Sequence, residues 1–332
     1  MDVVALVQGR DHASTRYRLL QFADLFVRRG LRLQIEPIAR SWSARLRQIN
    51  QDRRHQVVFI QRKLLPVWQT LLLRRRVGKL IYDFDDAVFL HDSNHPDGLD
   101  SITRRLRFRA IVRSADVLLA GNHYLADQAR EYTRNEKIEI VPTCVDPNIY
   151  PAALHVDRQP TRMVWIGSSS TLASLERASS ILEGIGESIP GTELRVICDR
   201  FPRFRHLRVE DCPWRAGQEP EELRSSDIGL SWMPDDRWSS GKCGLKVLQY
   251  MAAGLPVIAN PVGIHREIID EPFGFLPETK EDWLDSVSKL SRDSALRRQM
   301  GHAGREAIRT RFAIDRWGPV IADRLVDAGR AL

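Results

Sequence analysis

The strongest constraint on the fold is an alternation of short apolar segments with stretches of helical periodicity, which runs through the first half of the chain and restarts in the second. Such alternation is typical of a parallel sheet covered on both faces by helices. The apolar segments lie at 3–7, 31–35, 56–61, 79–83, 116–120 and 137–141, and then at 162–166, 194–198, 228–232 and 256–260. Helical spacing marks 16–29, 172–185, 219–225 and 242–253, and the tail from residue 281. The sequence therefore predicts an α/β protein with two Rossmann-like sheets.

The segment 141–151 separates the two series, because its three prolines interrupt both patterns. At roughly 150 residues per domain, a chain of 332 residues corresponds to about two domains. We therefore predict a first domain over 1–150 and a second that begins at 151. Folds of this kind bind ligands at the carboxyl ends of their strands, so we expect the site there, between the two halves.

The charge balance favours an anionic partner. Lys and Arg number 50 against 43 Asp and Glu, a formal net charge of +7, which suits nucleotide phosphates, phospholipid head groups or nucleic acid. Aromatic residues are not interleaved with the basic runs as a nucleic-acid groove requires, so nucleic acid ranks last.

Targeting and redox signals indicate a cytoplasmic protein. The chain starts MDVVALVQGRDH, without the basic and apolar regions of a signal peptide, and no apolar window is long enough to span a membrane. The four cysteines form no CxxC pair, which favours free thiols. A peripheral contact at the inner membrane face stays open.

Residues 239–263, SSGKCGLKVLQYMAAGLPVIANPVG, hold the most informative pattern. Small residues at 239–241 come directly before the predicted helix, where backbone N–H groups are unpaired. Lys242 and Lys246 follow one turn apart on one helix face. This combination suits a diphosphate. On spacing alone, a plain amphipathic helix with solvated lysines fits as well.

Further segments follow in a recognisable order. Ala253-Gly254 precedes Pro-Val-Ile-Ala at 256–259, then Val262-Gly263 and Glu267. Upstream lie Ser-Asp-Ile-Gly-Leu at 226–230, Trp-Ile-Gly at 165–167 and the linker VPTCVDPNIYP. Over roughly residues 138–318 the chain resembles the family 4 glycosyltransferases, which have the GT-B fold and retain the anomeric configuration of the sugar.

This resemblance implies two Rossmann-like domains that face an interdomain cleft. The N-terminal domain, 1–150, binds the acceptor in that family and is completed by a C-terminal helix, here about 314–332, that crosses back to it. The C-terminal domain, here 151–313, binds the nucleotide-sugar donor. The GT-B fold generally works without a metal, so no cofactor is expected beyond the nucleotide-sugar co-substrate.

Two departures from the family pattern concern the donor site. A glutamate pair that holds the donor sugar and the ribose is replaced by Gly241 and Gln249. An Arg and a Lys that bind the diphosphate are replaced by hydroxyl residues at 168–171. Gln249 still hydrogen-bonds a diol. The predicted donor-binding residues are Gly167, Ser168, Ser169, Thr171, Ser240, Gly241, Lys242, Lys246, Gln249, Gly263 and Glu267.

The first half supplies the predicted acceptor side and catalytic carboxylates. The segment after the first strand is similar to a Ser-x-x-Arg-x-Arg motif of some bacterial members, with Gly9, Ser14, Arg16 and Arg18 as acceptor-side residues, although a solvated helix start also fits. Tyr-Asp-Phe-Asp-Asp at 82–86 follows a buried strand. We predict Asp85 and Asp86, with Lys246, as catalytic residues, the carboxylates orienting or deprotonating an acceptor hydroxyl. A capping role is the alternative for the aspartates, and no metal site is predicted.

Residues 102–112 alternate apolar residues with arginines, as in a basic helix at a membrane surface, although a solvated charged face fits equally. The function predicted is transfer of a sugar, with retention, from a nucleotide-sugar donor to a glycan or lipid-linked acceptor in surface polysaccharide or glycolipid biosynthesis. Two alternatives stay open: a catalytically degenerate binding or scaffold subunit, and a nucleotide-sugar 2-epimerase.

Overall fold

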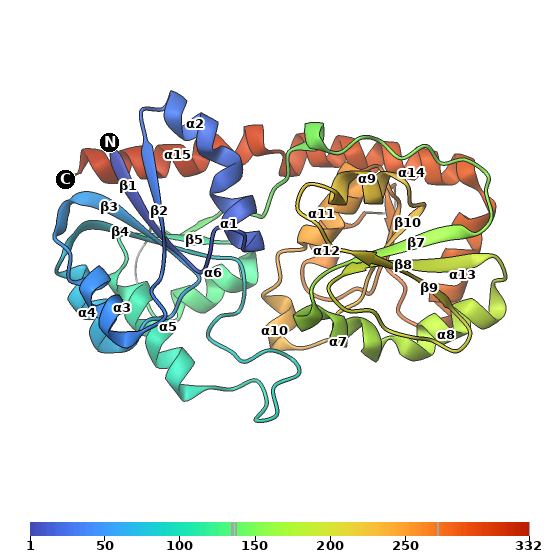
Figure 1. Ribbon diagram of the computed structural model, residues 1–332, viewed down its shortest axis with the longest axis horizontal. Helices are drawn as coiled ribbons and strands as arrows, with labels where there is room; N and C mark the ends of the chain where they lie inside the picture. The colour runs from blue at the N-terminus through green and yellow to red at the C-terminus, as the bar shows by residue number, and fades with distance from the viewer. Residues whose placement is uncertain (134–135, 137, 271, 332) are drawn as a thin grey trace. The chain divides into compact units, whose positions relative to one another are not determined.

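The computed structural model describes residues 1–332 except 134, 135, 137, 271 and 332 (Figure 1). It forms two compact units. The first consists of Met1–Cys144, Asp236–Cys243 and Ile314–Leu332, and the second of Val145–Asp235 and Gly244–Ala313. Lys137, the first residue of the predicted segment 137–141, lies outside the described residues.

The sheet of the first unit has six parallel strands in the order β2-β1-β3-β4-β5-β6. They are β1 (Asp2–Val7), β2 (Arg32–Pro37), β3 (Arg53–Gln61), β4 (Val77–Phe84), β5 (Val117–Ala120) and β6 (Ile138–Ile140). Along β1, Val4 and Leu6 join one buried cluster while Val3, Ala5 and Val7 join another. Since successive side chains of a strand point to opposite faces, both faces of this sheet are buried, as its apolar segments predict.

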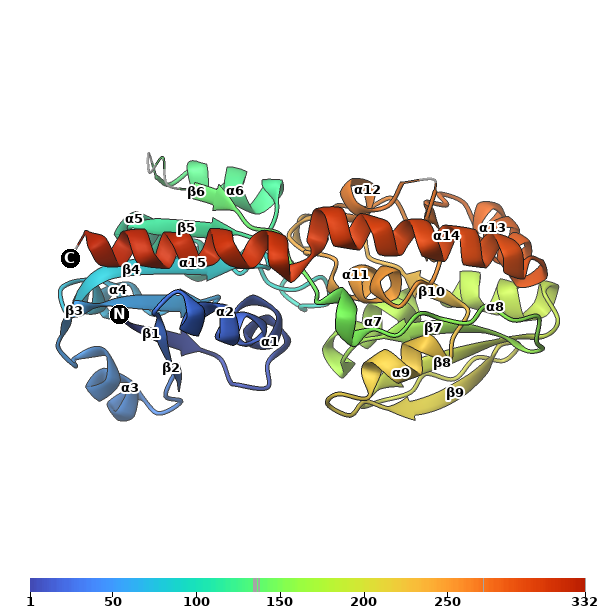
Figure 2. The same cartoon turned by 90° about the horizontal axis from the view of Figure 1, so that it is seen from above.

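The helices of the first unit cover these two faces. They are α1 (Ala13–Arg18), the short 3-10 helix η1 (Leu20–Phe22), α2 (Ala23–Arg28), α3 (Trp42–Ile49), α4 (Val67–Arg74), α5 (Ile102–Ser114), α6 (His123–Arg130), α10 (Arg237–Ser240) and α15 (Ile314–Arg330). The C-terminal helix α15 contributes Ile321, Ala322 and Leu325 to the cluster that contains Val3, and Figure 2 shows it running along this sheet. The predicted return of the C-terminal helix to the N-terminal sheet is confirmed.

The sheet of the second unit also has six parallel strands, in the order β12-β11-β10-β7-β8-β9. They are β7 (Thr161–Ile166), β8 (Thr192–Cys198), β9 (Arg208–Pro213), β10 (Ile228–Ser231), β11 (Val257–Ala259) and β12 (Gly274–Phe275). Its helices are α7 (Ser169–Arg177), α8 (Ser179–Ser188), α9 (Glu219–Arg224), α11 (Leu245–Ala252), α12 (His265–Ile268), α13 (Lys280–Arg292) and α14 (Ser294–Ala307). The short 3-10 helix η2 (Pro147–Ile149) lies in the linker, and the π-helical turn η3 (Ile308–Phe312) follows α14. The α/β class and the two parallel sheets are as predicted.

Two predicted helices are interrupted. The helix expected over 16–29 breaks at Leu19, whose φ of −137° is not helical, and continues as η1 and α2. The side chain of Gln21 donates hydrogen bonds to the carbonyls of Tyr17 and Cys144, so the turn around Leu19 is held by a side chain instead of the backbone ladder. The helix expected over 172–185 is divided into α7 and α8 at Ala178.

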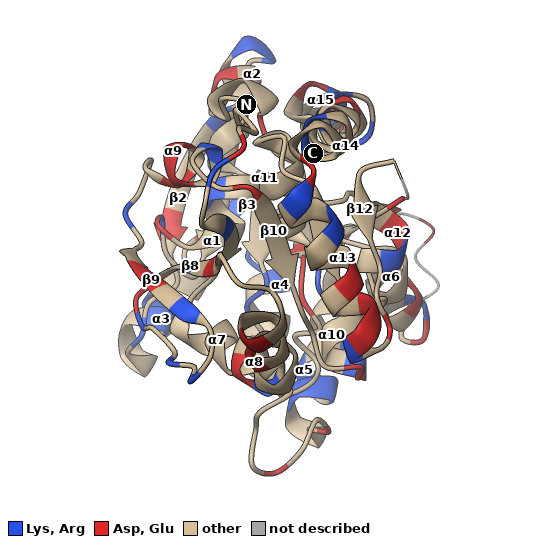
Figure 3. Cartoon of the chain, turned by 90° about the vertical axis from the view of Figure 1, so that its right-hand side faces the viewer, with Lys and Arg blue, Asp and Glu red and all other residues tan. Residues whose placement is uncertain are grey.

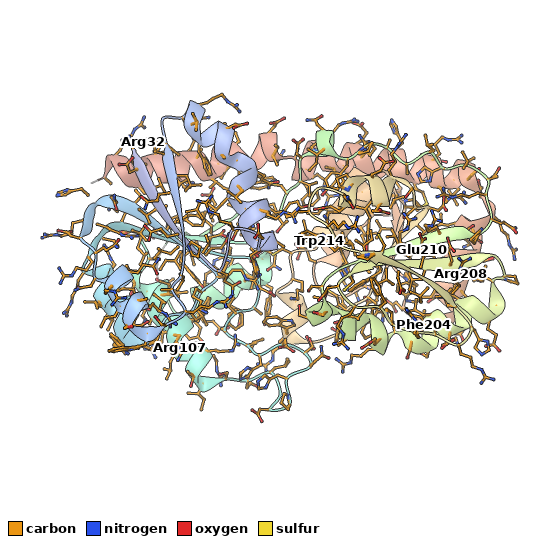
Figure 4. The ribbon with its side chains drawn as sticks, in the orientation of Figure 1. Arg32, Arg107, Phe204, Arg208, Glu210 and Trp214 are labelled. Carbon is orange, nitrogen blue, oxygen red and sulfur yellow. The ribbon has the colours of Figure 1, made fainter. Side chains whose placement is uncertain are left out.

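Strand β9 was not predicted from the sequence because it is joined to its neighbours by ion pairs of charged residues. Arg195 of β8 pairs with Glu210 of β9 at 2.9 Å, and Arg162 of β7 contacts the same carboxylate at 2.8 Å and Glu193 of β8 at 3.0 Å. Residues of both signs are visible on β9 in Figure 3, and Glu210 and Arg208 are labelled in Figure 4. A strand with this pairing has no apolar run. The two-residue strand β12 was not predicted either.

Within the described part of the chain, no helix is both long and apolar enough to cross a bilayer.

Candidate functional site

In the first unit, the carboxyl ends of β1, β3 and β4 bring together a network of charged side chains. Arg62, the residue after β3, donates from Nη1 to Ser14 Oγ at 2.8 Å and from Nη2 to Asp86 Oδ2 at 2.6 Å. Its Nε lies 3.4 Å from Asp85 Oδ1. Arg62 has φ +57°, a left-handed conformation that costs energy in a residue with a Cβ and that marks functional sites when it is enforced. Sequence reasoning missed Arg62, since nothing in the local pattern distinguishes it from other arginines.

Arg18, a predicted acceptor-side residue, is bound inside this unit. Its side chain and that of Asp83 are each 2% exposed, and Arg18 Nη2 lies 2.5 Å from Asp83 Oδ1. Arg18 Nη1 also donates to the carbonyl of Val141 at 2.9 Å. Burial alone lowers the pKa of an arginine, but the Asp83 carboxylate outweighs burial and raises the pKa of Arg18 above its ordinary value. The structure gives Arg18 a packing role, because both partners are closed off from solvent.

Ser14 is buried beside this pair, whereas Gly9 and Arg16 lie outside it. Gln61 links the start of α1 to the strand ends, accepting a hydrogen bond from Thr15 Oγ1 at 2.9 Å and donating to the carbonyl of Ser14 at 3.1 Å. Gly9 lies in the partly exposed loop after β1. The guanidinium of Arg16 lies 5.4 Å from the centre of its neighbour Tyr17's ring. Ser14 is thus the acceptor-side residue that reaches the Asp85 and Asp86 network.

Asp85 has the electrostatic setting of an ionised carboxylate. Burial raises the pKa of Asp85, but Arg62 and Arg18 outweigh that effect and hold its pKa below the ordinary value. Among the described residues, none donates a hydrogen bond to the buried Oδ1 of Asp85. This oxygen is itself buried and lies 3.4 Å from the Nε of Arg62.

The segment 236–243 belongs to the first unit, which corrects the predicted position of Lys242 on a helix with Lys246. The expected helix over 242–253 begins only at Leu245, after Gly244 adopts a left-handed φ of +68°. Asp236 caps the separate short helix α10, with Gly241 at its end. Lys242 lies between the two helices, where its Nζ is 3.1 Å from Asp86 Oδ1. Lys242 and Lys246 therefore do not share a helix face.

Hydrogen bonds hold this segment against the loops of the first unit. Asn122 donates from its side-chain amide to the carbonyls of Ser240 and Lys242, at 3.0 Å each. A Cβ at Gly241 would lie 2.6 Å from the Cβ of Ala87, so the approach of the two backbones requires glycine there. Ser240 and Gly241 are thus placed beside the aspartate network, and no helix N-terminus lies at 239–241.

In the second unit, α11 is anchored where the strand order reverses between β7 and β10. Tyr250 Oη accepts a hydrogen bond from the Ile166 backbone at 2.9 Å and donates to the Leu230 carbonyl at 3.1 Å. Its ring fills the space beside Gly229, where a Cβ would lie 2.4 Å from the ring. Ligands of parallel α/β sheets bind at such reversal points, at the carboxyl ends of the strands. The predicted Ile-Gly-Leu strand is therefore a structural part of this anchor.

Lys246 lies in the first turn of α11, next to this reversal point. Its Nζ is 4.1 Å from the centre of the Trp165 ring, the geometry of a cation–π contact. Trp165 is fully buried at the end of β7. A Cβ at Gly167 would lie 2.3 Å from the same indole, so the chain needs glycine where it leaves β7. Gly167 and Lys246, predicted as donor-binding residues, thus lie around one indole ring.

The hydroxyl residues after Gly167 form the start of α7. Ser168 and Thr171 make a reciprocal capping box, in which the Ser168 backbone donates to Thr171 Oγ1 at 3.2 Å. The Ser169 backbone N–H donates to Asp199 Oδ1 at 2.7 Å. The side-chain and backbone bonds to Ser169 and the Cys198 thiol lower the pKa of Asp199. Asp199, which sequence reasoning missed, follows β8 and brings a carboxylate to the N-terminus of α7.

The other predicted donor residues lie on neighbouring elements. Gln249 is buried on α11 and donates to Tyr150 Oη at 3.2 Å. Gly263, with φ +50°, lies in the loop after β11. Glu267 on α12 has an exposed side chain, and its carbonyl accepts a hydrogen bond from Arg311 at 2.7 Å.

A buried histidine that sequence reasoning missed joins β10 to the loop after β11. His265 Nε2 lies 2.9 Å from Ser231 Oγ, and Nδ1 lies 2.8 Å from the Asn260 carbonyl. Burial lowers the pKa of His265 to about 4, with a further contribution from nearby Lys246. His265 is therefore a neutral structural link near neutral pH.

Within the described ranges of the chain, no three His, Cys, Asp or Glu side chains gather in a group able to hold a metal ion. The expectation of a metal-independent reaction stays a prediction.

Comparison with known proteins agrees with this geometry. Residues 229–307 match the family model described as glycosyl transferases group 1. No curated protein matches the sequence. Sucrose-phosphate synthase from Thermosynechococcus elongatus is similar in structure over 100% of both chains, with a TM-score of 0.74 and 13% identity.

Two further solved structures are similar over nearly the whole chain. HepE from Anabaena, in complex with UDP and glucose, has a TM-score of 0.70 and 13% identity over 98% of this chain and 100% of its own. WaaG, a glycosyltransferase involved in lipopolysaccharide biosynthesis, has a TM-score of 0.66 and 15% identity over 98% of this chain and 99% of its own. The solved structures show that the chain has the GT-B fold, and its residues 229–307 are similar to the group 1 glycosyl transferases.

Proposed function

We propose that this protein transfers a sugar, with retention of configuration, from a nucleotide-sugar donor to a glycan or lipid-linked acceptor, as a member of family 4. In the reaction, the bond between the anomeric carbon and the diphosphate oxygen breaks. The acceptor oxygen bonds to that carbon, and the acceptor proton leaves to a base. Surface polysaccharide or glycolipid biosynthesis is the proposed setting.

The observation that carries the donor side is the position of Lys246 over Trp165, beside the start of α7. A cation and helix N–H groups at the reversal point of a parallel sheet suit the two phosphates of a nucleotide sugar. The same groups stabilise the negative charge that develops on the leaving diphosphate, which is the main catalytic demand of the reaction. We assign the diphosphate to Lys246, Gly167, Ser168, Ser169 and Thr171.

The remaining donor contacts follow from the same placement. Gln249, buried one turn further along α11, is assigned to the ribose hydroxyls. Gly263 and Glu267, after β11, are assigned to the donor sugar.

The acceptor side of the proposal rests on Asp85 and Asp86. Arg62 holds Asp85 ionised, and Asp85 Oδ1 receives no hydrogen bond among the described residues. In the proposal, the Asp85 carboxylate accepts the proton, or the hydrogen bond, of an acceptor hydroxyl. Ser14 and Arg62 position these carboxylates through their mutual hydrogen bond.

A ligand-dependent thermal shift tests the donor assignment. Any ligand that binds the folded state stabilises it by mass action, so the protein is heated with UDP-, GDP-, ADP- and dTDP-sugars, with Mg²⁺ or with EDTA. HepE and the pneumococcal O-GlcNAc transferase GtfA are described in complex with UDP, so UDP-sugars are the first choice. The expected result is a rise in Tm with one nucleotide class that EDTA does not abolish. No shift with any donor would contradict the proposal and favour a degenerate scaffold subunit.

Turnover separates the proposal from the two remaining alternatives. With the identified donor, the transferase releases nucleoside diphosphate in an acceptor-dependent reaction, and NMR of the product reports whether the anomeric configuration is retained. Release of a 2-epimer of the sugar without an acceptor would identify an epimerase. Binding without any product would identify a binding subunit.

A further inference from the structure

Three helices of the first unit form one strongly basic face. Helix α4 packs against both α3 and α5, and Figure 1 shows the three side by side. Their sequences, WSARLRQI, VWQTLLLR and ITRRLRFRAIVRS, contain eight arginines and no aspartate or glutamate. Charges of a single sign over three adjacent helices indicate a surface that attracts an anionic partner.

The same helices expose large apolar side chains. Of the twelve exposed large hydrophobic residues in the described part of the chain, six lie on α3, α4 and α5, so half of them belong to these three adjacent helices. They are Trp42, Val67, Trp68, Leu71, Ile102 and Leu106, of which Ile102 is 73% exposed and Trp42 is 62% exposed. Apolar side chains that gather in this way mark an interaction site, whereas scattered ones need no explanation.

On α5, other residues than the exposed ones pack the helix against the sheet. Helix α5 is fixed by Phe108, Ile111 and Val112, which are buried in the core of the first unit. Ile102 and Leu106 lie earlier on the same helix and remain exposed. The exposed set therefore has no packing role on α5.

Burial and arginines of α3 and α5 lower the pKa of Lys63, which lies shortly after β3. Burial lowers the pKa of Lys63, and Arg45 of α3 with Arg107 and Arg104 of α5 lowers it further. The nearby carboxylates are Asp100, 3.9 Å from Arg105, and Asp116, 3.5 Å from Arg74. Most of the eight arginines thus keep their positive charge available at this face.

We propose that the exposed face of α3, α4 and α5 is a docking surface for an anionic lipid bilayer. Its tryptophans and aliphatic side chains enter the interfacial region, and its arginines contact the lipid phosphates. The aliphatic members, such as Leu71, Ile102 and Leu106, favour lipid over nucleic acid, because they offer no flat face on which a base stacks. This docking rests on the proposed function only in that a lipid-linked acceptor would give the contact its use.

Vesicle co-sedimentation of the full chain tests the surface. The vesicles contain phosphatidylcholine alone or with added phosphatidylglycerol. Arg107→Gln removes one cation from α5, and Arg32→Gln on β2 is its control; both arginines are labelled in Figure 4. Leu106→Ser removes one apolar anchor, and Val27→Ser on α2, where the side chain is 71% exposed, is its control.

The expected result is binding to the anionic vesicles that weakens as salt increases. Arg107→Gln weakens it about fivefold, the effect of one cation near an anionic surface. Leu106→Ser weakens it roughly tenfold through lost apolar burial, and neither control changes it. An equal loss in Arg32→Gln would show that only the net charge of the chain is sensed, and an equal loss in Val27→Ser would show that the apolar contact is not specific to these helices. Either result, or absence of binding, would overturn the proposal.

Two further arms separate this inference from other outcomes. A single-stranded RNA that competes for the face, in the absence of vesicle binding, would identify a nucleic-acid surface and overturn the lipid assignment. The donor-dependent thermal shift is measured on the same variants without vesicles. If vesicle binding fails while the donor shift persists, the docking surface is wrong and the glycosyltransferase proposal stands.

Discussion

At the strand ends of the first unit, each cation of the network lies within reach of a carboxylate: Arg18 with Asp83, and Arg62 and Lys242 with Asp86. At the strand ends of the second unit, Lys246 lies over an indole ring, and the start of α7 carries hydroxyl side chains and a backbone N–H of Ser169 that donates to Asp199. The first arrangement is electrostatically balanced by the protein itself. The second is suited to an anion brought by a ligand. The comparison leads us to expect that the ion pairs of the first unit contribute mainly to stability, and that Lys246 and the start of α7 take part in the proposed donor binding.

The largest effect is expected where the balanced network is broken. Arg18→Met leaves Asp83 buried without its cation, and removing one partner of a buried pair costs about 3–5 kcal/mol. We expect a corresponding loss in the free energy of unfolding, measured by urea denaturation. The control is Arg32→Met, which removes a pair with Asp2 whose side chains are 83% and 51% exposed. An exposed pair of that kind contributes about 1 kcal/mol at most.

The result sharpens the comparison in either direction. If Arg18→Met and Arg32→Met lose similar stability, Arg18 is not structural and its predicted acceptor role returns. The double variant Arg18→Met with Asp83→Leu should recover part of the loss, because an apolar pair replaces a charge left alone.

A smaller effect is expected from acid in the second unit. His265 has a pKa lowered to about 4 by burial, so the folded protein keeps it neutral while the unfolded chain protonates it near the ordinary value of 6.5. The unfolded state therefore binds more protons as the pH falls from 6.5 towards 4, and stability present above pH 6.5 is lost over that range. The loss amounts to about 3 kcal/mol when complete.

Urea denaturation across this pH range measures that loss. His265→Gln should be less stable than the natural chain at neutral pH, yet its stability should fall less steeply with acid. The same slope in both proteins would mean that other groups cause the acid sensitivity.

The two lysines offer the most direct test of the comparison. Lys246→Ala should weaken nucleotide-sugar binding by roughly 10- to 100-fold, because a hydrogen bond to a charged phosphate contributes about 1.5–3 kcal/mol. Lys242→Ala should weaken it far less, since Lys242 is paired with Asp86 in the other unit. Donor titrations by calorimetry give both affinities. Equal losses would place Lys242 in the donor site, as the sequence alone predicts.

Much of the fold was predictable because burial on both sheet faces produces continuous apolar strands. Val3–Val7 and the other apolar segments are found as strands, and the helical tail from residue 281 is found as α13, α14 and α15. Strand β9 was not predictable by this rule, since its charged residues pair with Arg162 and Arg195 on neighbouring strands. A hydrophobic pattern cannot indicate a strand that is held by ion pairs.

The site was predictable where it follows strand ends and was missed where it depends on contacts distant in sequence. Asp85, Asp86 and the residues after β7 lie at strand ends, as the alternation indicates. The departure of Lys242 from the helix depends on the left-handed Gly244 and on Asn122, which lies 120 positions earlier in the chain. Arg62, Asp199 and His265 likewise gain their significance only from partners in other segments.

The smallest effect concerns Asp199, a carboxylate at the carboxyl end of β8 in the second unit. Asp199 accepts a hydrogen bond from the Ser169 backbone at the start of α7, where the proposal places the diphosphate. Asp199→Asn keeps an acceptor for that N–H but removes a negative charge near the phosphates. A charge at a helix N-terminus has an effect of about 0.3–1 kcal/mol, so donor affinity should rise about two- to fivefold. The exposed Asp211→Asn on β9, where Arg203 is the partner, is the matched control. Weaker donor binding by Asp199→Asn would instead make this carboxylate a donor ligand and move the diphosphate away from α7.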